Sequence, residues 1–171
     1  MASTVEIVAQ PVALSEEEAR ERVTHSPVER LRSLVTSRKV VTGKLKYKPF
    51  YAFPVVLRKR VFRGDDIVKE GRIIVDGLSD ISRPFTEESI EEEEVVVSDG
   101  QLIKPTVNVE DALMTAKSRR MQVEHRERGE MEIEETPSVV YKPVWLFELG
   151  TGDIRVVDAT DGSVFSDLLI G

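Results

Sequence analysis

The tripeptide Tyr-Lys-Pro occurs once in each half of this chain, beginning at Tyr47 and at Tyr141. Each copy leads into an aromatic and aliphatic run, and a branched-aliphatic segment that ends in aspartate follows, at Asp76 and at Asp158. Ordinary composition gives about one chance tripeptide match in a chain of this length, so the phrase alone is weak evidence. The same order of several anchors in both halves is stronger evidence, and it predicts two similar structural units.

A related helix start precedes each copy of the tripeptide. Ser15 is followed three positions later by Glu18, and Asn108 is followed three positions later by Asp111. A capping side chain with an acidic residue at this spacing is typical of the first turn of a helix. We therefore expect one helix before each pair of strands.

The matching residues of the two halves are not evenly separated. Phe53 and Phe147 are 94 residues apart, whereas Asp76 and Asp158 are 82 residues apart. The difference arises between these positions, in a segment that is predicted to contain a turn, and turns tolerate insertions. This placement favours a tandem duplication. The alternative is two unrelated hairpins that use similar strand residues.

These patterns predict an α+β fold made of two similar helix-plus-antiparallel-sheet units, residues 1–84 and 105–171, which pack side by side or pair their sheets. Residues 85–104 are predicted to form an acidic linker and a small hairpin, because Asp99-Gly100 favours the positive backbone angles of a tight turn. Helices are expected from Ser15, over 27–37 and from Asn108. Strands are expected over 40–62, 72–76, 131–134, 139–149 and 154–158.

The carboxyl-terminal segment resembles PepSY-like domains. Its order is a helix from Asn108, a strand that begins at Tyr141, and then the phrase Val157-Asp158-Ala159-Thr160-Asp161-Gly162. In that family a helix packs on an antiparallel sheet, and the final strand commonly ends in a similar valine-aspartate phrase. The first half is similar only through Val75-Asp76-Gly77. The resemblance implies a helix-on-sheet layout, and it implies a role in inhibiting or regulating peptidases.

Composition limits the chemistry of the chain. The 171 residues are 40% hydrophobic, which is enough to bury a core, and the absence of cysteine excludes disulfides, thiolate nucleophiles and cysteine-ligated metals. The amino terminus has no basic region followed by an apolar stretch, and no segment approaches the ~18 apolar residues of a membrane span. We therefore expect a soluble, cytoplasmic protein that does not contact membranes.

Charge is unevenly distributed, although the formal net charge is −7. The segment 38–63 contains nine lysines and arginines and no acidic residue, and five aromatic residues lie among them. This interleaving could stack bases and neutralise phosphates, but it also describes a strand with aromatics in the core and basic residues in water. The predicted interaction surface comprises Lys46, Lys48, Tyr51, Arg58, Lys59, Arg60, Arg63 and Trp145.

No pattern in the sequence supports catalysis, and no cofactor or metal ligand set is predicted. Asp158 and Asp161 could both face a hard cation, but a turn held by aspartate-to-backbone hydrogen bonds is the favoured interpretation. His25 and His125 stand beside charged or polar residues and are expected on the surface. Trp145 is expected to pack in the core in the place that Tyr51 takes in the first half; the alternative is an exposed anchor for a partner.

The sequence therefore predicts a non-catalytic protein-interaction or regulatory module, with PepSY-like inhibition as one version of that role. Its partner is expected to be a protein of unknown identity, and sheet edges offer a route to homo-oligomers. The alternative hypothesis is a nucleic-acid-binding accessory protein that uses the basic and aromatic segment 38–63.

Overall fold

The computed structural model describes residues 3–25, 42–83, 85, 91–150 and 152–169. In this part of the chain there are two α-helices, one short 3-10 helix and eight strands, so the fold is α+β. The strand pairing is mostly antiparallel; β1 meets β6 in parallel, and one isolated bridge is also parallel. The helix predicted over 27–37 lies outside the described residues. Within them, no helix has the length and apolar character needed to cross a membrane.

The chain divides into two compact units, and each unit combines residues from both halves of the sequence. The sequence instead predicts consecutive units over 1–84 and 105–171. The difference arises because each helix packs on a hairpin from the other half of the chain. Unit 1 comprises residues 1–48, 91–104 and 141–171, and unit 2 comprises residues 49–90 and 105–140.

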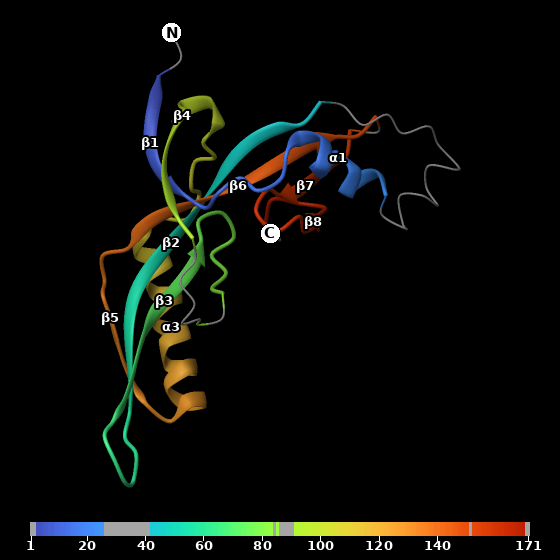
Figure 1. Ribbon diagram of the computed structural model, residues 1–171. Helices are drawn as coiled ribbons and strands as arrows, with labels where there is room; N and C mark the ends of the chain where they lie inside the picture. The colour runs from blue at the N-terminus through green and yellow to red at the C-terminus, as the bar shows by residue number, and fades with distance from the viewer. Residues whose placement is uncertain (1–2, 26–41, 84, 86–90, 151, 170–171) are drawn as a thin grey trace. The chain divides into compact units, whose positions relative to one another are not determined.

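In unit 1, helix α1 (Glu16–Thr24) packs on the hairpin of β6 (Ser138–Glu148, from residue 141 onward) and β7 (Ile154–Asp158), as Figure 1 shows. The capping box predicted at Ser15 is confirmed: its hydroxyl accepts the Glu18 N–H at 3.3 Å, and the Glu18 carboxylate accepts the Ser15 N–H at 2.8 Å. The strand β8 (Val164–Phe165) pairs with β7. The buried contacts between helix and hairpin involve Ala19, Val23, Phe147, Leu149 and Val157.

Unit 1 also contains a ribbon of β1 (Thr4–Ala9) and β4 (Glu93–Ser98), which pair antiparallel along their whole lengths. The hairpin predicted around Ser98 is not formed. Residues Asp99–Gln101 are instead a 3-10 helix, η1, in which the Gln101 side chain accepts the Ser98 N–H at 3.0 Å. β4 pairs with β1 at six positions, so its partner is this strand, which is distant in sequence, and not the segment that follows Gly100.

In unit 2, β2 (Lys44–Lys59, from residue 49 onward) pairs with β3 (Ile67–Asp76) from Phe50 to Lys59. The other edge of β2 pairs with β5 (Glu130–Ile133), and this confirms the strand predicted from the alternation after residue 130. Figure 1 shows the long β2–β3 hairpin and helix α3 beside it. Of the predicted acidic linker, Glu93 and Glu94 already belong to β4, and residues 86–90 lie outside the described part of the chain.

Helix α3 (Val109–Glu127) begins at Asn108, whose side-chain oxygen accepts the Asp111 N–H at 2.8 Å, so the predicted start is confirmed. Val109, the first residue of the helix, is exposed. At the other end, Gly129 passes so close to β2 that a Cβ there would lie 2.7 Å from the Arg58 carbonyl oxygen. Ala112, Ala116 and Val123 are buried on the inner face of α3.

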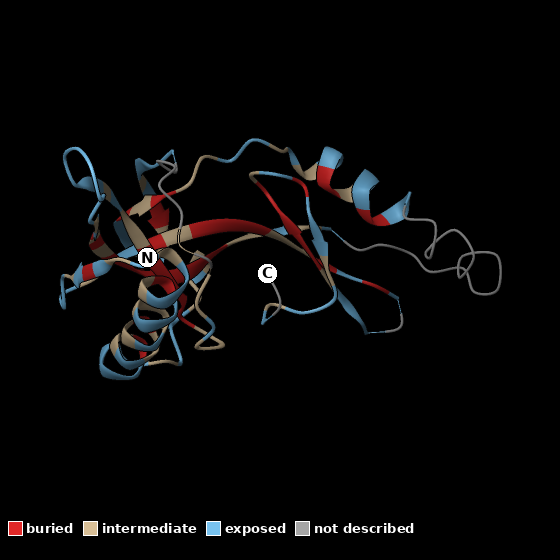
Figure 2. Cartoon of the chain, turned by 90° about the horizontal axis from the view of Figure 1, so that it is seen from below, coloured by how far each residue is buried: buried red, intermediate tan, exposed pale blue. Residues whose placement is uncertain are grey.

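Both helices bury one side and expose the other, as Figure 2 shows by colour. The core of unit 2 lies between α3 and the sheet, where fully buried side chains such as Phe53 and Leu57 each contribute about 1.5–3 kcal/mol relative to exposure. The opposite face of the same sheet carries a smaller buried cluster. Its members are Phe50, Ala52, Ile74 and Val140.

Candidate functional site

The turn after β7 is held by a buried aspartate. The Oδ1 atom of Asp158 accepts the Thr160 N–H at 2.8 Å and the Asp161 N–H at 3.3 Å, and its Oδ2 atom forms an ion pair with Lys142. Only 1% of Asp158 is exposed. Both carboxylate oxygens are therefore engaged by the protein, which confirms the turn interpretation of this motif.

The turn after β3 in unit 2 has the same geometry. The Oδ1 atom of Asp76 accepts the Leu78 N–H at 2.8 Å and the Ser79 N–H at 3.3 Å. Each turn also has a residue in the left-handed region at the same place, Asp80 with φ 55° and Gly162 with φ 80°. The two aspartates that end the predicted strands therefore organise equivalent turns.

Each turn is joined to the start of the helix in its own unit. The Ala159 carbonyl accepts two backbone N–H groups at 2.8 and 2.9 Å, and the Gly77 carbonyl accepts two at 2.9 and 3.0 Å. In both units the donors are the two residues before the helix cap. They are Ala13 and Leu14 in unit 1, and Thr106 and Val107 in unit 2.

An aromatic side chain completes each junction. In unit 2 the Tyr51 hydroxyl donates to the Val107 carbonyl at 2.7 Å, and in unit 1 the Trp145 Nε1 donates to the Leu14 carbonyl at 2.9 Å. Each acceptor is the residue immediately before a helix cap. Tyr51 is buried and Trp145 is half-buried, so both aromatics act as core residues with a satisfied polar group.

The two tyrosines of the repeated tripeptide also have matching surroundings within unit 1. The Tyr47 carbonyl accepts the Ile103 N–H at 3.0 Å, and the Tyr141 carbonyl accepts the Gln10 N–H at 2.9 Å. Both rings pack in one cluster around Ile7, and burial raises the pKa of each hydroxyl above its ordinary value. These contacts place the tripeptides at equivalent positions around the β1–β4 ribbon.

Burial removes two residues from the predicted interaction surface. Lys48 is 1% exposed and Tyr51 is 4% exposed, so neither side chain is available to a partner. The aromatics that were expected to stack bases are buried as well, because the first part of β2 is covered on both faces. The buried aromatics of this segment are Tyr47, Phe50, Tyr51 and Phe53.

The end of the β2–β3 hairpin presents the exposed remainder of that surface. Arg58, Arg60 and Arg63 are exposed, and Phe62 between them is 98% exposed. Residues 58–63 are called the basic hairpin tip below. Lys59 is half-buried and forms an ion pair with Glu127 on α3. Two other predicted residues lie in unit 1, where the Lys46 ammonium donates to the Gly100 carbonyl and Trp145 belongs to the helix junction.

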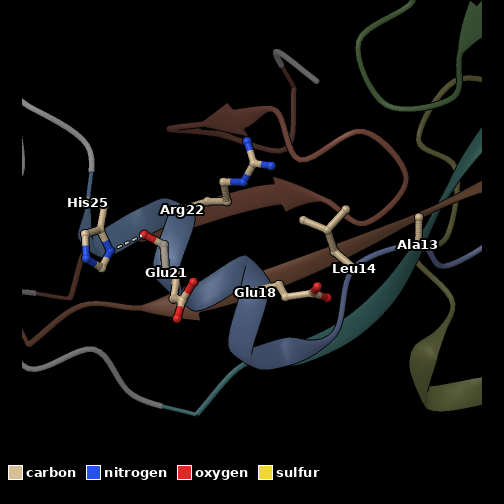
Figure 3. A pocket seen from close by; sticks show the side chains of 6 residues that line it. All are labelled: Ala13, Leu14, Glu18, Glu21, Arg22 and His25. Carbon is tan, nitrogen blue, oxygen red and sulfur yellow. Dashed lines mark hydrogen bonds between the residues drawn. The ribbon is translucent and has the colours of Figure 1, made fainter.

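A groove accompanies the helix–turn junction in each unit. The unit-1 groove is charged, with Glu18, Glu21, Arg22 and His25 along α1 beside Leu14, as Figure 3 shows. Arg22 lies against the turn, since a Cβ on Gly162 would be 3.3 Å from its guanidinium carbon. His25 is exposed as predicted, and its Nδ1 atom lies 3.0 Å from the Glu21 carbonyl oxygen.

The unit-2 groove lies at the corresponding place between α3 and the turn after β3. When the two sequences are aligned at the helix caps Ser15 and Asn108, Glu21 of α1 aligns with Met114 of α3. At this position the unit-2 groove therefore presents a methionine where the unit-1 groove presents a glutamate. Six of the lining residues are Asp80, Ile81, Asp111, Met114, Ser118 and Gln122.

Comparison with known proteins gives no match: no protein family, curated protein or solved structure is similar to this chain. In the described ranges no three side chains of histidine, cysteine, aspartate or glutamate are grouped so as to hold a metal ion. The sequence patterns did not reveal the unit-2 groove, although Met114, which falls outside the buried stripe of α3, was a local signal for it.

Proposed function

We propose that this chain is a non-catalytic protein-interaction module whose contact surface is the basic hairpin tip. The single observation that carries this proposal is the 98% exposure of Phe62 among exposed arginines. Aromatic and arginine side chains dominate the energetics of protein interfaces, because both bury large areas and arginine adds directional hydrogen bonds. An aromatic ring left in water beside them is suited to docking into a partner.

The geometry of the hairpin supports this use of its tip. Ten antiparallel residue pairs join β2 and β3 from Phe50 to Lys59, and β5 pairs with β2 from residue 55 to residue 58. The ion pair between Lys59 and Glu127 fixes the base of the tip to α3. Arg60, Phe62 and Arg63 themselves lie in the unpaired loop 60–66, so the strand ladder fixes the base from which the tip projects and leaves the loop exposed.

We also propose that the two units are copies of one helix-plus-hairpin template, and that this template is PepSY-like. The equal aspartate-to-backbone distances at Asp76 and Asp158 support this proposal, and so do the matching aromatic donors at Tyr51 and Trp145. A PepSY-like role would make the partner of the module a peptidase that the module inhibits or regulates.

Binding of nucleic acid is the second candidate function. It is favoured by the three exposed arginines of the basic hairpin tip, which could neutralise phosphates. Burial of the four aromatics of β2 opposes it, because a single exposed ring provides a small platform for stacking bases. We therefore rank it below protein interaction.

The test is recovery of partners by the full-length chain and by Phe62→Ser, after nuclease treatment. A protein that the wild type retains and the variant loses is the expected result. Lys104→Glu, a charge change at an exposed residue in unit 1, is the control and should retain the same protein. Equal recovery by wild type and Phe62→Ser would contradict the proposal, and binding that nuclease removes and salt weakens steeply would support nucleic acid instead.

A further inference from the structure

The unit-2 groove is lined by two exposed apolar side chains at positions that are polar in unit 1. Ile81 is 61% exposed and Met114 is 69% exposed, and both line the groove. The corresponding positions in unit 1 are Ser163 and Glu21, which are polar. These two solvent-facing apolar side chains, one on each wall, give the groove a small apolar centre.

The walls of the unit-2 groove are fixed to one another. The Thr115 hydroxyl donates to an Asp80 carboxylate oxygen at 2.7 Å, so the turn is tied to α3. One turn further along α3, the Arg119 guanidinium donates to the Ser82 hydroxyl at 2.8 Å and to the Ser82 carbonyl at 3.1 Å. The groove is therefore formed before any partner arrives, which favours binding.

The rim of the groove is acidic, and the basic hairpin tip complements it. Asp80 and Asp111 line the groove together with Arg119, whose guanidinium donates to Ser82 and keeps its positive charge, so the lining carries one net negative charge. The hairpin tip has the opposite charge: its apolar ring, Phe62, lies between Arg60 and Arg63 in the sequence. Asp65 and Asp66 follow in the same loop, so residues 58–66, with four basic and two acidic side chains, keep a net positive charge beside the apolar ring. The groove combines its two apolar side chains with a net negative charge.

We propose that the partner of the basic hairpin tip is the unit-2 groove of a second copy of this chain. Phe62 of one copy lies on Ile81 and Met114 of the next, and the flanking arginines face Asp80 and Asp111. This inference rests on the proposed function of the tip and names its partner. The contact is head-to-tail, so each copy keeps one free tip or groove, and further copies can add.

The proposed interface is small and therefore weak. Stable protein interfaces involve about 20–30 residues on each side, whereas the tip and the groove each offer far fewer. Opposite charges at an exposed rim act over about 10 Å at 0.1 M salt, so the association weakens as salt increases. Self-association is expected at high protein concentration and low ionic strength.

Sedimentation velocity of the full-length chain, at concentrations up to about 1 mM, tests the proposal with two variants. Phe62→Ser removes the apolar contact of the tip, and Met114→Glu replaces the apolar contact of the groove with a charge. Each variant alone should therefore remain a monomer. An equal mixture of the two should form a dimer that does not grow, because one variant keeps its groove and the other keeps its tip. Restoration on mixing is the result that supports a head-to-tail contact.

Two controls address the surface and the fold. Met121→Glu places the same charge on another exposed methionine of α3 that does not line the groove, and it should associate like the wild type. Circular dichroism of each variant checks that it is folded. If Met114→Glu does not fold, Ile81→Asp replaces it, because this exposed residue lines the opposite wall of the groove.

Several results would overturn the proposal. They are a wild type that stays monomeric over the whole range, self-association that either variant leaves unchanged, and a mixture that remains monomeric. If the wild type is monomeric but Phe62→Ser still loses a different captured protein, the proposed function stands and this inference fails. If Phe62→Ser changes neither the recovery of partners nor the sedimentation of the chain, both the proposed function and this inference fail.

Discussion

Unit 1 and unit 2 have the same junction between helix and turn, but they differ in how far the elements extend beyond it. The helix of unit 1 has 9 residues and that of unit 2 has 19, and the strands that end in aspartate have 5 and 10 residues. The shared junction holds each unit together. The added length in unit 2 carries the hairpin tip, so the proposed contact surface resides in the extension, whereas Met114 occupies the position of Glu21 in the shared part of the helix.

The largest expected effect comes from breaking the unit-1 junction with Asp158→Ala. This change removes the ion-pair partner of the buried Lys142 ammonium, which typically costs about 3–5 kcal/mol, and the nearby Asp161 carboxylate places the loss at the lower end of that range. Urea unfolding measures the loss. Asp158→Asn keeps an oxygen for the turn and should cost less, whereas a loss below about 1 kcal/mol for Asp158→Ala would show that the pair behaves as a surface ion pair.

A direct comparison of the junctions is offered by Tyr51→Phe in unit 2 and Trp145→Phe in unit 1. Each change leaves the carbonyl before a helix cap without its donor, which costs about 1–3 kcal/mol. Trp145→Phe also removes buried ring area and should be the larger loss. If only one of the two variants loses stability in urea unfolding, the junctions are not energetically equivalent.

Smaller effects are expected at the left-handed positions of the two turns. Gly162→Ala places a Cβ on a residue with φ 80° and should cost about 1–2 kcal/mol. In unit 2, Asp80→Gly relieves the same strain but removes the hydrogen bond from Thr115, so the two contributions oppose each other and the net change is smaller. Thermal unfolding of both variants measures the difference, and a large loss for Asp80→Gly would show that the hydrogen bond dominates.

The smallest expected effect concerns the matched tyrosines Tyr47 and Tyr141. Burial favours the neutral hydroxyl and raises its pKa in the folded state. The stability that each contributes is present below the unfolded pKa of about 10 and is lost as pH rises through the higher folded value. Urea midpoints of Tyr47→Phe and Tyr141→Phe should therefore fall less above pH 10 than that of the wild type. Equal pH profiles for all three proteins would argue against burial of the hydroxyls.

Local signals in the sequence predicted the parts of the fold that depend on neighbouring residues. The capping side chains Ser15 and Asn108, and the aspartate that closes β7, make contacts within a few positions, so their spacing is visible in the sequence. The pairing of β1 with β4 is not visible, because it joins Thr4 to Ser98 and competes with a plausible local hairpin. The packing of each helix on a hairpin from the other half of the chain is not visible either, because it also joins residues that are distant in sequence.

The candidate site was predicted in part. Arg58, Arg60 and Arg63 are exposed as expected of charged residues. Lys48 is buried, although lysine is mostly found exposed. Several consecutive residues of β2 are buried, so this strand lacks the alternation of buried aromatic and exposed basic residues that the sequence suggested. The unit-2 groove could not be foreseen, because Ile81 and Met114 lie far apart in sequence and only the turn-to-helix contacts bring them together.

The pairing of each helix with a hairpin from the other half has a consequence for synthesis of the chain on the ribosome. The residues of α1 are synthesised early, but the strands that cover its apolar side extend to Asp158. Unit 2 needs only the residues up to Val140. During translation, all residues of unit 2 are therefore synthesised before the strands that bury Ala19 and Val23 of unit 1. Until then these two apolar side chains stay exposed to solvent.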